Sequence, residues 1–283
     1  MKSPQEIAAA YLGIAEKKAA MPAHRLFILG IFAGAFIAFA AAGAGTASCL
    51  IENAGVAKLV GALIFPAGLA MVMLAGGELF TGNCLMISAV LQRKISLFAM
   101  LRNWALVYAG NFAGALLIAW LVSAGHQLSL FDGALAQSAV LTATAKLKLG
   151  FWDAFIRGIL CNMLVCVAVW MGLAAKEAGG VILGLYLPVM LFVLCGFEHS
   201  VANMYYVPVG LLALQGGAGA AGEAVSLGWP AFLLRNLLPV TLGNIAGGML
   251  VGAGYWRCYL GVRTAVAQQD AVTAPGQSVL RGD

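Results

Sequence analysis

Two segments, GGELFTGN at residues 76–83 and GFEHSVAN at residues 196–203, interrupt two long apolar stretches of the chain. Both segments place glutamate, asparagine and glycine where the flanking sequence is apolar. A charged side chain at bilayer depth costs roughly 2.5 to 3.5 kcal/mol on insertion scales, so it is retained chiefly where it faces a pathway or a bundle interior. Interrupted helices in matching positions of two halves are typical of proteins with a midplane binding site. The pair of segments therefore predicts a transporter or channel.

The composition indicates an integral membrane protein. Hydrophobic residues make up 62% of the 283 residues and charged residues only 10%, which leaves too few polar side chains to cover a soluble globule. Six apolar runs exceed the roughly 20 residues that cross a bilayer as a helix. They cover about residues 26–52, 59–91, 98–125, 151–175, 180–215 and 229–260. We predict an all-α protein with six transmembrane helices, of which the second and fifth are broken.

The two halves of the chain repeat each other in sequence. Segments 101–114 and 234–247 align without a gap at an offset of 133 and share eight of 14 residues. The first and fourth spans also match, because FILGI at residues 27–31 corresponds to FIRGI at residues 155–159. The aligned asparagines of the third and sixth spans are Asn103 with Asn236 and Asn111 with Asn244. The glycine pairs Gly110-x3-Gly114 and Gly243-x3-Gly247 suit close helix packing in a membrane.

The interrupting segments share a polar pattern, since Glu78 and Asn83 have the same five-residue spacing as Glu198 and Asn203. Each half has three spans, and this odd number turns the second half upside down relative to the first. The predicted inverted repeats cover residues 26–125 and 151–260.

The breaks also predict the charge of the solute. A helix broken inside the membrane has unpaired backbone groups, which must face protein or a water-filled cavity. A half-helix that begins there directs its positive dipole end to the bilayer centre, and two converging ends favour an anion. A carboxylate would repel that anion unless a lysine, an amide or backbone N–H groups hold its charge. We interpret the following polar residues as structural: Glu78, Asn83, Asn203, Asn111 and Asn244.

The basic residues predict the orientation. With the N-terminus inside, eleven lysines and arginines lie on the inner side and five on the outer side, and the positive-inside rule then favours cytoplasmic termini. This loop excess accounts for the net charge of +5 without a nucleic-acid partner. We expect a multi-pass protein of a bacterial inner (plasma) membrane.

Residues 1–25 are too charged for a signal peptide and are predicted to form a cytoplasmic amphipathic helix. Ser3 and Glu6 form a capping box at its start. The apolar side chains of one face are Ile7, Tyr11 and Ile14. We expect this helix to lie on the membrane or on a neighbouring subunit, and a gate or a docking element for a cytoplasmic enzyme is the alternative. The pore domain then covers residues 26–260, and residues 264–283 form a cytoplasmic tail that we predict to be disordered.

Enzyme and cofactor signatures are absent from the sequence. The six cysteines lie in or beside apolar spans without a C-x-x-C pair, which favours small buried side chains. No phosphate loop, zinc signature or nucleophile elbow occurs, and the three histidines are not at ligand spacing. We expect no enzyme activity, no cofactor and no metal.

Four motifs carry a more specific resemblance. They are ELFTGN (78–83), GILCN (158–162), GFEHSVANM (196–204) and NLLPVTLGN (236–244). Together they resemble the formate/nitrite transporter family, and the match covers about residues 3–260. The resemblance implies an aquaporin-like fold of six helices, a pentamer in the lipid bilayer, and one pore per protomer for small monovalent anions.

The same resemblance implies functions for individual residues. Thr81 and His199 match the central polar pair of the family. Lys146 matches its electropositive vestibule and Asn162 the neighbour of the histidine, and we include Glu198 with these in the substrate pathway. The residues that match its two apolar constrictions are Phe65, Leu69, Leu79 and Phe192.

Formate is the expected solute, because the fifth-span motif continued through VPVG at residues 207–210 looks most like the formate channels. We expect bidirectional, pH-dependent transport. Proton transfer from His199 would let formate pass the apolar residues as formic acid, whereas a wet channel would pass the anion directly. Nitrite or hydrosulfide is the alternative within the family.

Two further readings stay open. An aquaporin-like channel for neutral solutes would be expected to carry two Asn-Pro-Ala motifs, and this chain has neither. A structural or sensory membrane component would use its N-terminal helix to recruit a cytoplasmic enzyme.

Overall fold

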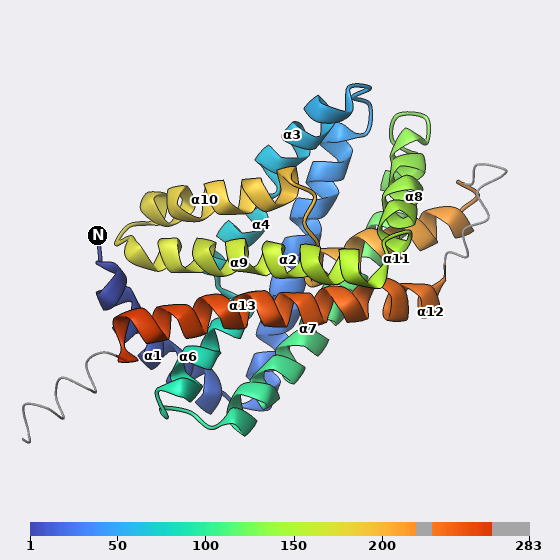
Figure 1. Cartoon of the computed structure of the whole chain (residues 1–283). Helices are drawn as coiled ribbons and strands as arrows, with labels where there is room; N and C mark the ends of the chain where they lie inside the picture. Colours follow the sequence, from blue (N-terminus) through green and yellow to red (C-terminus); the bar gives the residue numbers. More distant parts are fainter. Residues whose placement is uncertain (219–227, 262–283) are drawn as a thin grey trace, which may run out of the picture.

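The computed structural model describes residues 1–218 and 228–261, so the predicted tail at residues 264–283 lies outside the described residues. Within the described part every regular element is helical (Figure 1). In chain order the helices are α1 (Pro4–Ala20), α2 (Ala23–Ser48), α3 (Ala54–Ile64), α4 (Pro66–Met71), η1 (Val72–Gly76), α5 (Phe80–Asn83), η2 (Cys84–Met86), α6 (Ile87–Leu91), α7 (Leu97–Ala124), η3 (Gln127–Ser129), α8 (Ala134–Leu147), α9 (Phe151–Ala174), α10 (Ala178–Leu194), α11 (Ser200–Gln215), α12 (Trp229–Ala231), η4 (Phe232–Leu237) and α13 (Leu238–Tyr259).

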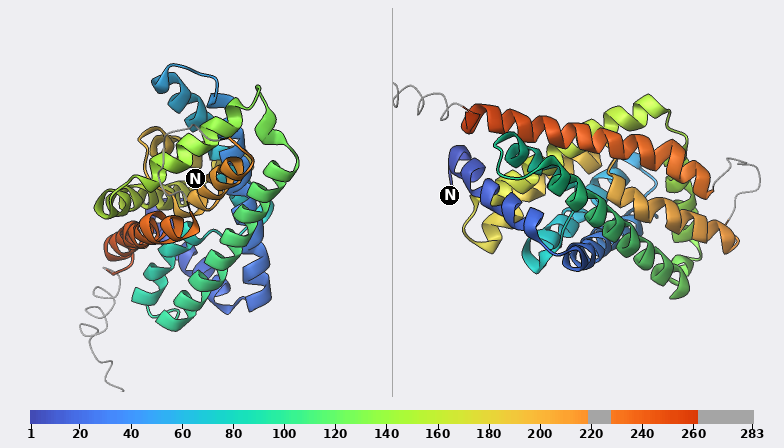
Figure 2. Two further views of the ribbon diagram at one scale, coloured as in Figure 1. Left: turned by 90° about the vertical axis from the view of Figure 1, so that its right-hand side faces the viewer. Right: turned by 90° about the horizontal axis from the view of Figure 1, so that it is seen from below.

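Five helical segments among the described residues have the length and apolar composition of a membrane span. They are Ala23–Ser48, Ala54–Gly76, Leu97–Ala124, Phe151–Ala174 and Trp229–Tyr259. The predicted fifth span is divided into the shorter helices α10 and α11. The N-terminus and the end of α13 lie at the same end of the bundle (Figure 1 and the right-hand view of Figure 2).

The two helix breaks lie where the sequence predicts them. The first separates the end of η1 at Gly76 from the start of α5 at Phe80, and the second separates Leu194 from Ser200. Gly76 and Gly196 both have positive φ, at 93° and 70°, a backbone conformation in which a Cβ atom is strained. Glycine therefore lets the chain leave the helix at each break.

Glycines bring the helices of each half into close contact. A Cβ atom on Gly110 of α7 would meet the carbonyl oxygen of Phe27 on α2. The same contact recurs between Gly243 of α13 and the carbonyl oxygen of Phe155 on α9. Figure 1 shows α9 and α13 lying side by side. The predicted function of the two glycine pairs in helix packing is therefore confirmed.

Helix α1 buries one face against its own chain. Ser3 and Glu6 form the predicted capping box, and Ile7 and Ala8 pack in a cluster with Trp170. The apolar face of α1 meets α9 and α13 of the same chain, and a position on the membrane or on a neighbouring subunit stays a prediction.

Helix α8 was not predicted from the sequence. It carries Lys146 in its last turn, so this lysine belongs to a separate helix that precedes the fourth span. The offset of 128 that relates α2 to α9 also relates Lys18 of α1 to Lys146 of α8. The sequence correspondence between the halves therefore extends to α1 and α8, which lie at opposite ends of the bundle (Figure 1).

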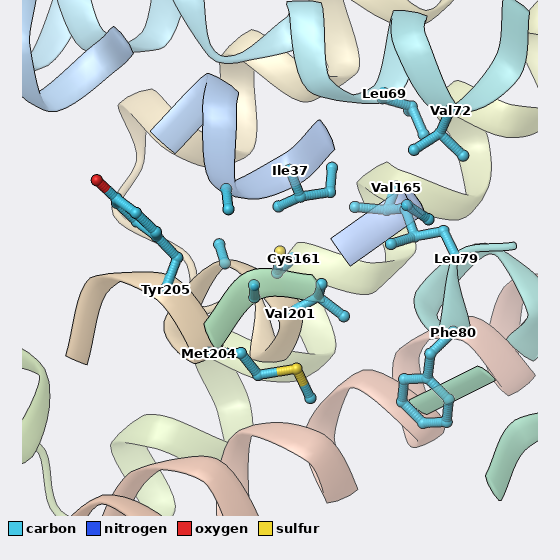
Figure 3. Close-up of a cluster of buried hydrophobic side chains, with 14 of the residues drawn as sticks. Ile37, Leu69, Val72, Leu79, Phe80, Cys161, Val165, Val201, Met204 and Tyr205 are labelled. Carbon is cyan, nitrogen blue, oxygen red and sulfur yellow. The ribbon is translucent and has the colours of Figure 1, made fainter. Parts of the chain in front are cut away.

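The apolar core joins both halves. Figure 3 shows side chains from α2, α4, η1, α5, α9 and α11 converging in one cluster, together with Leu79 before α5. Leu79, Val165 and Val201 are at most 4% exposed. Residues from both interrupted helices thus meet in the centre of the bundle.

The cysteines follow the expected burial only in part. All six are free, and Cys84, Cys161 and Cys166 are buried as predicted. Cys195 and Cys258 are exposed, so the prediction was wrong for these two. Cys195 directly follows α10, and Cys258 lies in the last turn of α13, so both are at helix ends.

Two glycine substitutions on α13 test the packing. Gly247→Ala would place a methyl group against the carbonyl oxygen of Ile159, and overpacking of this kind costs about 1–3 kcal/mol. We expect a lower unfolding temperature in detergent. Gly254→Ala is the matched control, because a Cβ atom there has no neighbour within 4 Å. Equal unfolding temperatures for the two variants would contradict the close contact of α9 and α13.

Candidate transport site

Thr81 and His199 meet in the middle of the bundle. Thr81 lies in the four-residue helix α5, and His199 is the N-cap residue of α11. Their side chains are in contact, with 3.1 Å between Thr81 Oγ1 and His199 Nε2. Thr81 is fully buried and His199 is 3% exposed. The structure thus brings the predicted central pair together from the two inverted halves.

The hydrogen bonds of His199 define its tautomer. The backbone N–H of Ala202 donates to His199 Nδ1 at 3.1 Å, so in the neutral ring the proton is on Nε2. Nε2–H then donates to Thr81 Oγ1. This arrangement leaves the hydroxyl hydrogen of Thr81 available to a solute.

Apolar side chains flank the polar pair. The rings of Phe65 and Phe192 contact edge to face with centroids 5.7 Å apart, and Phe192 stacks on the His199 ring at 5.8 Å. Leu69 and Leu79 line a cavity of about 310 Å³. We call it the inner cavity, and its other walls include residues of α1 and α9. All four predicted constriction residues are at most 4% exposed. Phe192 therefore contacts the central pair, and the function of the four residues as constrictions stays a prediction.

The inner cavity has a polar wall formed by α1 and the first break. Tyr11, Ile14 and Lys18 of α1 line it together with Glu78 and Asn83. A larger cavity of about 810 Å³ lies between α8 and the adjoining ends of α7 and α11. Neither cavity is lined by Thr81 or His199, but the inner cavity is lined by Leu69, Leu79 and residues of the first break. We therefore associate the inner cavity, rather than the larger one, with the site.

Glu78 belongs to a buried network that includes the N-terminal helix. Lys18 Nζ donates to both carboxylate oxygens of Glu78 at 2.7 Å and to Asn83 Oδ1 at 3.0 Å. Asn83 Nδ2 donates to Glu78 at 2.7 Å and to Asn103 at 2.9 Å. Asn103 Nδ2 donates to the carbonyl oxygen of Lys18 at 3.3 Å. The carboxylate charge is thus balanced by α1.

Glu198 has a corresponding network in the second half, except that Asn203 Oδ1 has no partner where Asn83 Oδ1 accepts from Lys18. Lys146 Nζ donates to both of its oxygens at 3.0 Å, and Asn203 Nδ2 donates to it at 2.6 Å. Asn203 also donates to Asn236 at 2.8 Å, and Asn236 donates to the carbonyl oxygen of Lys146 at 3.1 Å. Lys146 therefore neutralises the charge of Glu198.

Two asparagines bind the backbone at the breaks. Asn111 Oδ1 accepts from the N–H of Phe80 at 2.9 Å, and its Nδ2 donates to the carbonyl oxygens of Gly30 and Glu78 at 2.8 Å. At the second break, Asn244 Oδ1 accepts from the N–H of Ser200, and its Nδ2 donates to the carbonyl oxygens of Gly158 and Glu198. Such pairing is needed because unpaired backbone groups are costly inside a membrane.

Asn162 links the halves through the backbone rather than through His199. Its Nδ2 donates to the carbonyl oxygen of Thr81 at 3.2 Å and to that of Asn244 at 2.6 Å. We expected Asn162 to neighbour the histidine. The structure joins it to the backbone of Thr81, whose side chain contacts His199.

The two breaks differ where the central pair lies. At an offset of 120, Glu78 and Asn83 correspond to identical residues, but Leu79 corresponds to His199. Thr81 corresponds to Val201. The scaffold of the breaks is thus repeated, whereas the two contacting polar side chains are unique to one half each.

Three residues of these networks were not among the predicted site residues. Lys18 was counted only as a basic residue of the inner side, and Asn103 and Asn236 were noted only as repeat identities. The offset of 128 would have revealed Lys18, because it places Lys18 on Lys146. The first repeat was predicted to begin at residue 26, so Lys18 fell outside the compared residues. No group of three or more histidine, cysteine or acidic residues suitable for a metal occurs in the described part of the chain.

Interrupted helices in two inverted halves, meeting at a buried polar pair between apolar side chains, define a membrane channel or transporter. The sequence profile described as Formate/nitrite transporter matches residues 5–257. The chain belongs to this family.

Individual relatives cover most of the chain. A protein named "Probable formate transporter" from Methanothermobacter thermautotrophicus is 37% identical over 278 residues, which cover 92% of this chain and 97% of that protein. "Formate channel FocA" of Haemophilus influenzae is 38% identical over 244 residues, covering 83% of this chain and 86% of the relative.

Solved structures share the fold. The structure described as "Pentameric formate channel with formate bound" has a TM-score of 0.74 and 37% identity, and the match covers 86% of this chain and 99% of that one. An aquaglyceroporin from Plasmodium falciparum has a TM-score of 0.51 at 17% identity, over 86% of this chain and all of that one. The latter is a likeness of fold alone, and it agrees with the aquaporin-like architecture.

The Lys18 network predicts that α1 stabilises the bundle. Lys18→Met leaves the buried carboxylate of Glu78 without its cation, and breaking a buried pair in this way costs about 3–5 kcal/mol. We expect a clear fall in unfolding temperature in detergent. Lys17→Met is the matched control, because Lys17 is the exposed neighbour on the same helix. Adding Glu78→Gln to Lys18→Met should restore part of the loss, and no difference between Lys18→Met and Lys17→Met would contradict the ion pair's contribution.

Proposed function

We propose that this protein is a channel for small monovalent anions and that formate is its principal solute. The contact between Thr81 and His199, enclosed by apolar side chains, is the observation that carries this proposal. The two proteins compared above that are named for formate transport, and the solved channel with formate bound, support the choice of formate.

The charges near the breaks suit an anion. Each buried carboxylate is paired with a lysine, Glu78 with Lys18 and Glu198 with Lys146, so neither presents an uncompensated negative charge. A carboxylate solute approaches from the Lys146 side or from the inner cavity and loses part of its hydration shell beside the apolar residues. It then accepts a hydrogen bond from the hydroxyl of Thr81. Desolvation is the main barrier, which the donors between the apolar side chains reduce.

His199 makes the flux dependent on pH in either of two schemes. As an imidazolium it donates from both nitrogens, so it can no longer accept from the backbone N–H of Ala202. If the imidazolium gives its proton to formate, neutral imidazole and formic acid result, and the neutral acid crosses the apolar residues. If formate passes as the anion, the charge of His199 changes the barrier directly. Both schemes require a titratable side chain at this position.

The proposal also covers the oligomeric state of the protein and the membrane in which it lies. We infer a pentamer in a bacterial inner membrane, and the pentameric state of the related solved channel supports this. The pore domain is assigned to residues 26–260 and the cytoplasmic helix to residues 1–25. A cytoplasmic enzyme partner at α1 stays a prediction, and the exposed face available to it carries Glu16 and Lys17.

Reporter fusions test the proposed orientation. A fluorescent protein fused after Asp283 should fluoresce, and alkaline phosphatase at the same site should be inactive, because both termini face the cytoplasm. A fusion at Asp132, in the loop before α8, should show the opposite pattern. Active phosphatase at Asp283 would contradict the orientation.

Flux measurements test the solute and the histidine. In proteoliposomes we expect saturable or electrogenic uptake of labelled formate that changes between two pH values. His199→Phe should abolish the pH response while the protein still folds, because phenylalanine cannot titrate. His24→Phe is the matched control, since His24 is exposed and lies outside the site.

The possible outcomes separate the candidate functions. Formate flux with an unchanged pH response in His199→Phe would overturn the function of this residue. Faster flux of nitrite or hydrosulfide would reassign the solute within the family. Glycerol flux without anion flux would favour a neutral-solute channel, and no flux in a folded sample would favour a structural or recruiting membrane component.

A further inference from the structure

One buried hydroxyl, on a residue that lines the inner cavity, has no partner. Tyr11 of α1 is 2% exposed, and its hydroxyl oxygen makes no hydrogen bond with any described residue. Leaving a buried hydroxyl unpaired costs about 1–3 kcal/mol. Phenylalanine would fill the same space without that cost. The tyrosine therefore indicates that something outside the chain accepts its hydrogen bond.

The position of Tyr11 restricts what that partner can be. Tyr11, Ile14 and Lys18 are spaced by three and four residues, so they share one face of α1. All three line the cavity of about 310 Å³, which Leu69 and Leu79 also line. A small molecule in this cavity lies between α1 and the apolar residues that precede the central pair.

The chemistry of the cavity wall favours a small acceptor. The phenol hydroxyl is a hydrogen-bond donor at neutral pH, and Lys18 brings a positive charge to the same wall with 19% of its side chain exposed. Most of the remaining lining is apolar, with Leu29, Val72 and Leu173 among it. A small carboxylate fits this set, because its oxygens accept from the hydroxyl and are attracted by the ammonium group.

The other buried oxygens without a partner do not point to this cavity. In the described residues they belong to Ser200 and Asn203. Neither residue lines the inner cavity. Tyr11 is also held by the central apolar cluster, which fixes the position of its ring. The orphaned hydroxyl and the cavity are thus two independent observations that coincide at one residue.

We propose that the hydroxyl of Tyr11 donates a hydrogen bond to a small monovalent carboxylate in the inner cavity, before the solute reaches Leu69 and Leu79. This inference rests on the proposed function, because it assigns a further contact to the same solute. Tyr11 then contributes to affinity on the α1 side of the protein, and it does not participate in the chemistry of His199.

The test is Tyr11→Phe in membrane vesicles of both orientations. We expect the half-saturation concentration of formate presented on the α1 side to rise roughly 3- to 10-fold, as for the loss of one hydrogen bond, while the maximal flux is retained. Formate presented on the opposite side should show a smaller change. Tyr259→Phe is the matched control, because Tyr259 lies near the same end of the bundle but does not line the cavity.

A second measurement separates solute binding from protein packing. Without formate, Tyr11→Phe should unfold at the same temperature as the unchanged protein or at a higher one, because the variant removes an unpaired polar atom. Formate should raise the unfolding temperature of the unchanged protein more than that of the variant.

Each outcome decides the inference. An unchanged half-saturation concentration in an active Tyr11→Phe protein would overturn it and leave water as the partner of the hydroxyl. A lower unfolding temperature without formate would also overturn it, because the hydroxyl would then have a partner within the protein. Absence of formate flux in the unchanged protein would overturn the proposed function itself.

Discussion

The structure depends on satisfying the backbone of two helices that are broken within the membrane. Asn111 and Asn244 each bind one N–H group and two carbonyl groups at a break. An unpaired buried group costs about 1–3 kcal/mol, so each amide offsets a penalty that lipid could not. These asparagines lie on α7 and α13, which pack on α2 and α9 through glycines. The packing of four long helices thus positions the starts of α5 and α11, and with them Thr81 and His199.

The second constraint is the charge of the two buried carboxylates. It explains why the helices α1 and α8 are present in addition to the six spans. Glu78 and Glu198 are at most 6% exposed, and each needs a cation within hydrogen-bonding distance. Lys18 of α1 and Lys146 of α8 supply it from opposite ends of the bundle. Helix α1 is therefore the counterpart of α8 rather than an appended surface helix. The neutral pairs also leave a pathway in which an anion is not repelled by the scaffold.

The repeat separates the residues that support the candidate site from the central pair itself. The glutamates, lysines and asparagines of the networks recur in both halves, because each half has a broken helix and a buried carboxylate to stabilise. Thr81 and His199 do not recur, because Val201 and Leu79 stand at the corresponding positions of the other half. One half can then contribute the hydroxyl and the other the titratable ring. An asymmetric site is thereby built on a symmetric scaffold.

Hydropathy, repeats and capping residues determined the spans, both breaks, the inverted halves and the capped N-terminal helix, because these features depend on neighbours along the chain. The sequence also named the central pair through motif resemblance, although its contact joins residues 118 positions apart. Only the tertiary structure decided that Lys18 pairs with Glu78, that Asn162 binds the carbonyl of Thr81, and that the hydroxyl of Tyr11 lacks a partner. Those contacts depend on how helices that are distant in sequence pack together and on which atoms each side chain then contacts. Neither the packing nor these contacts can be read from a local sequence pattern.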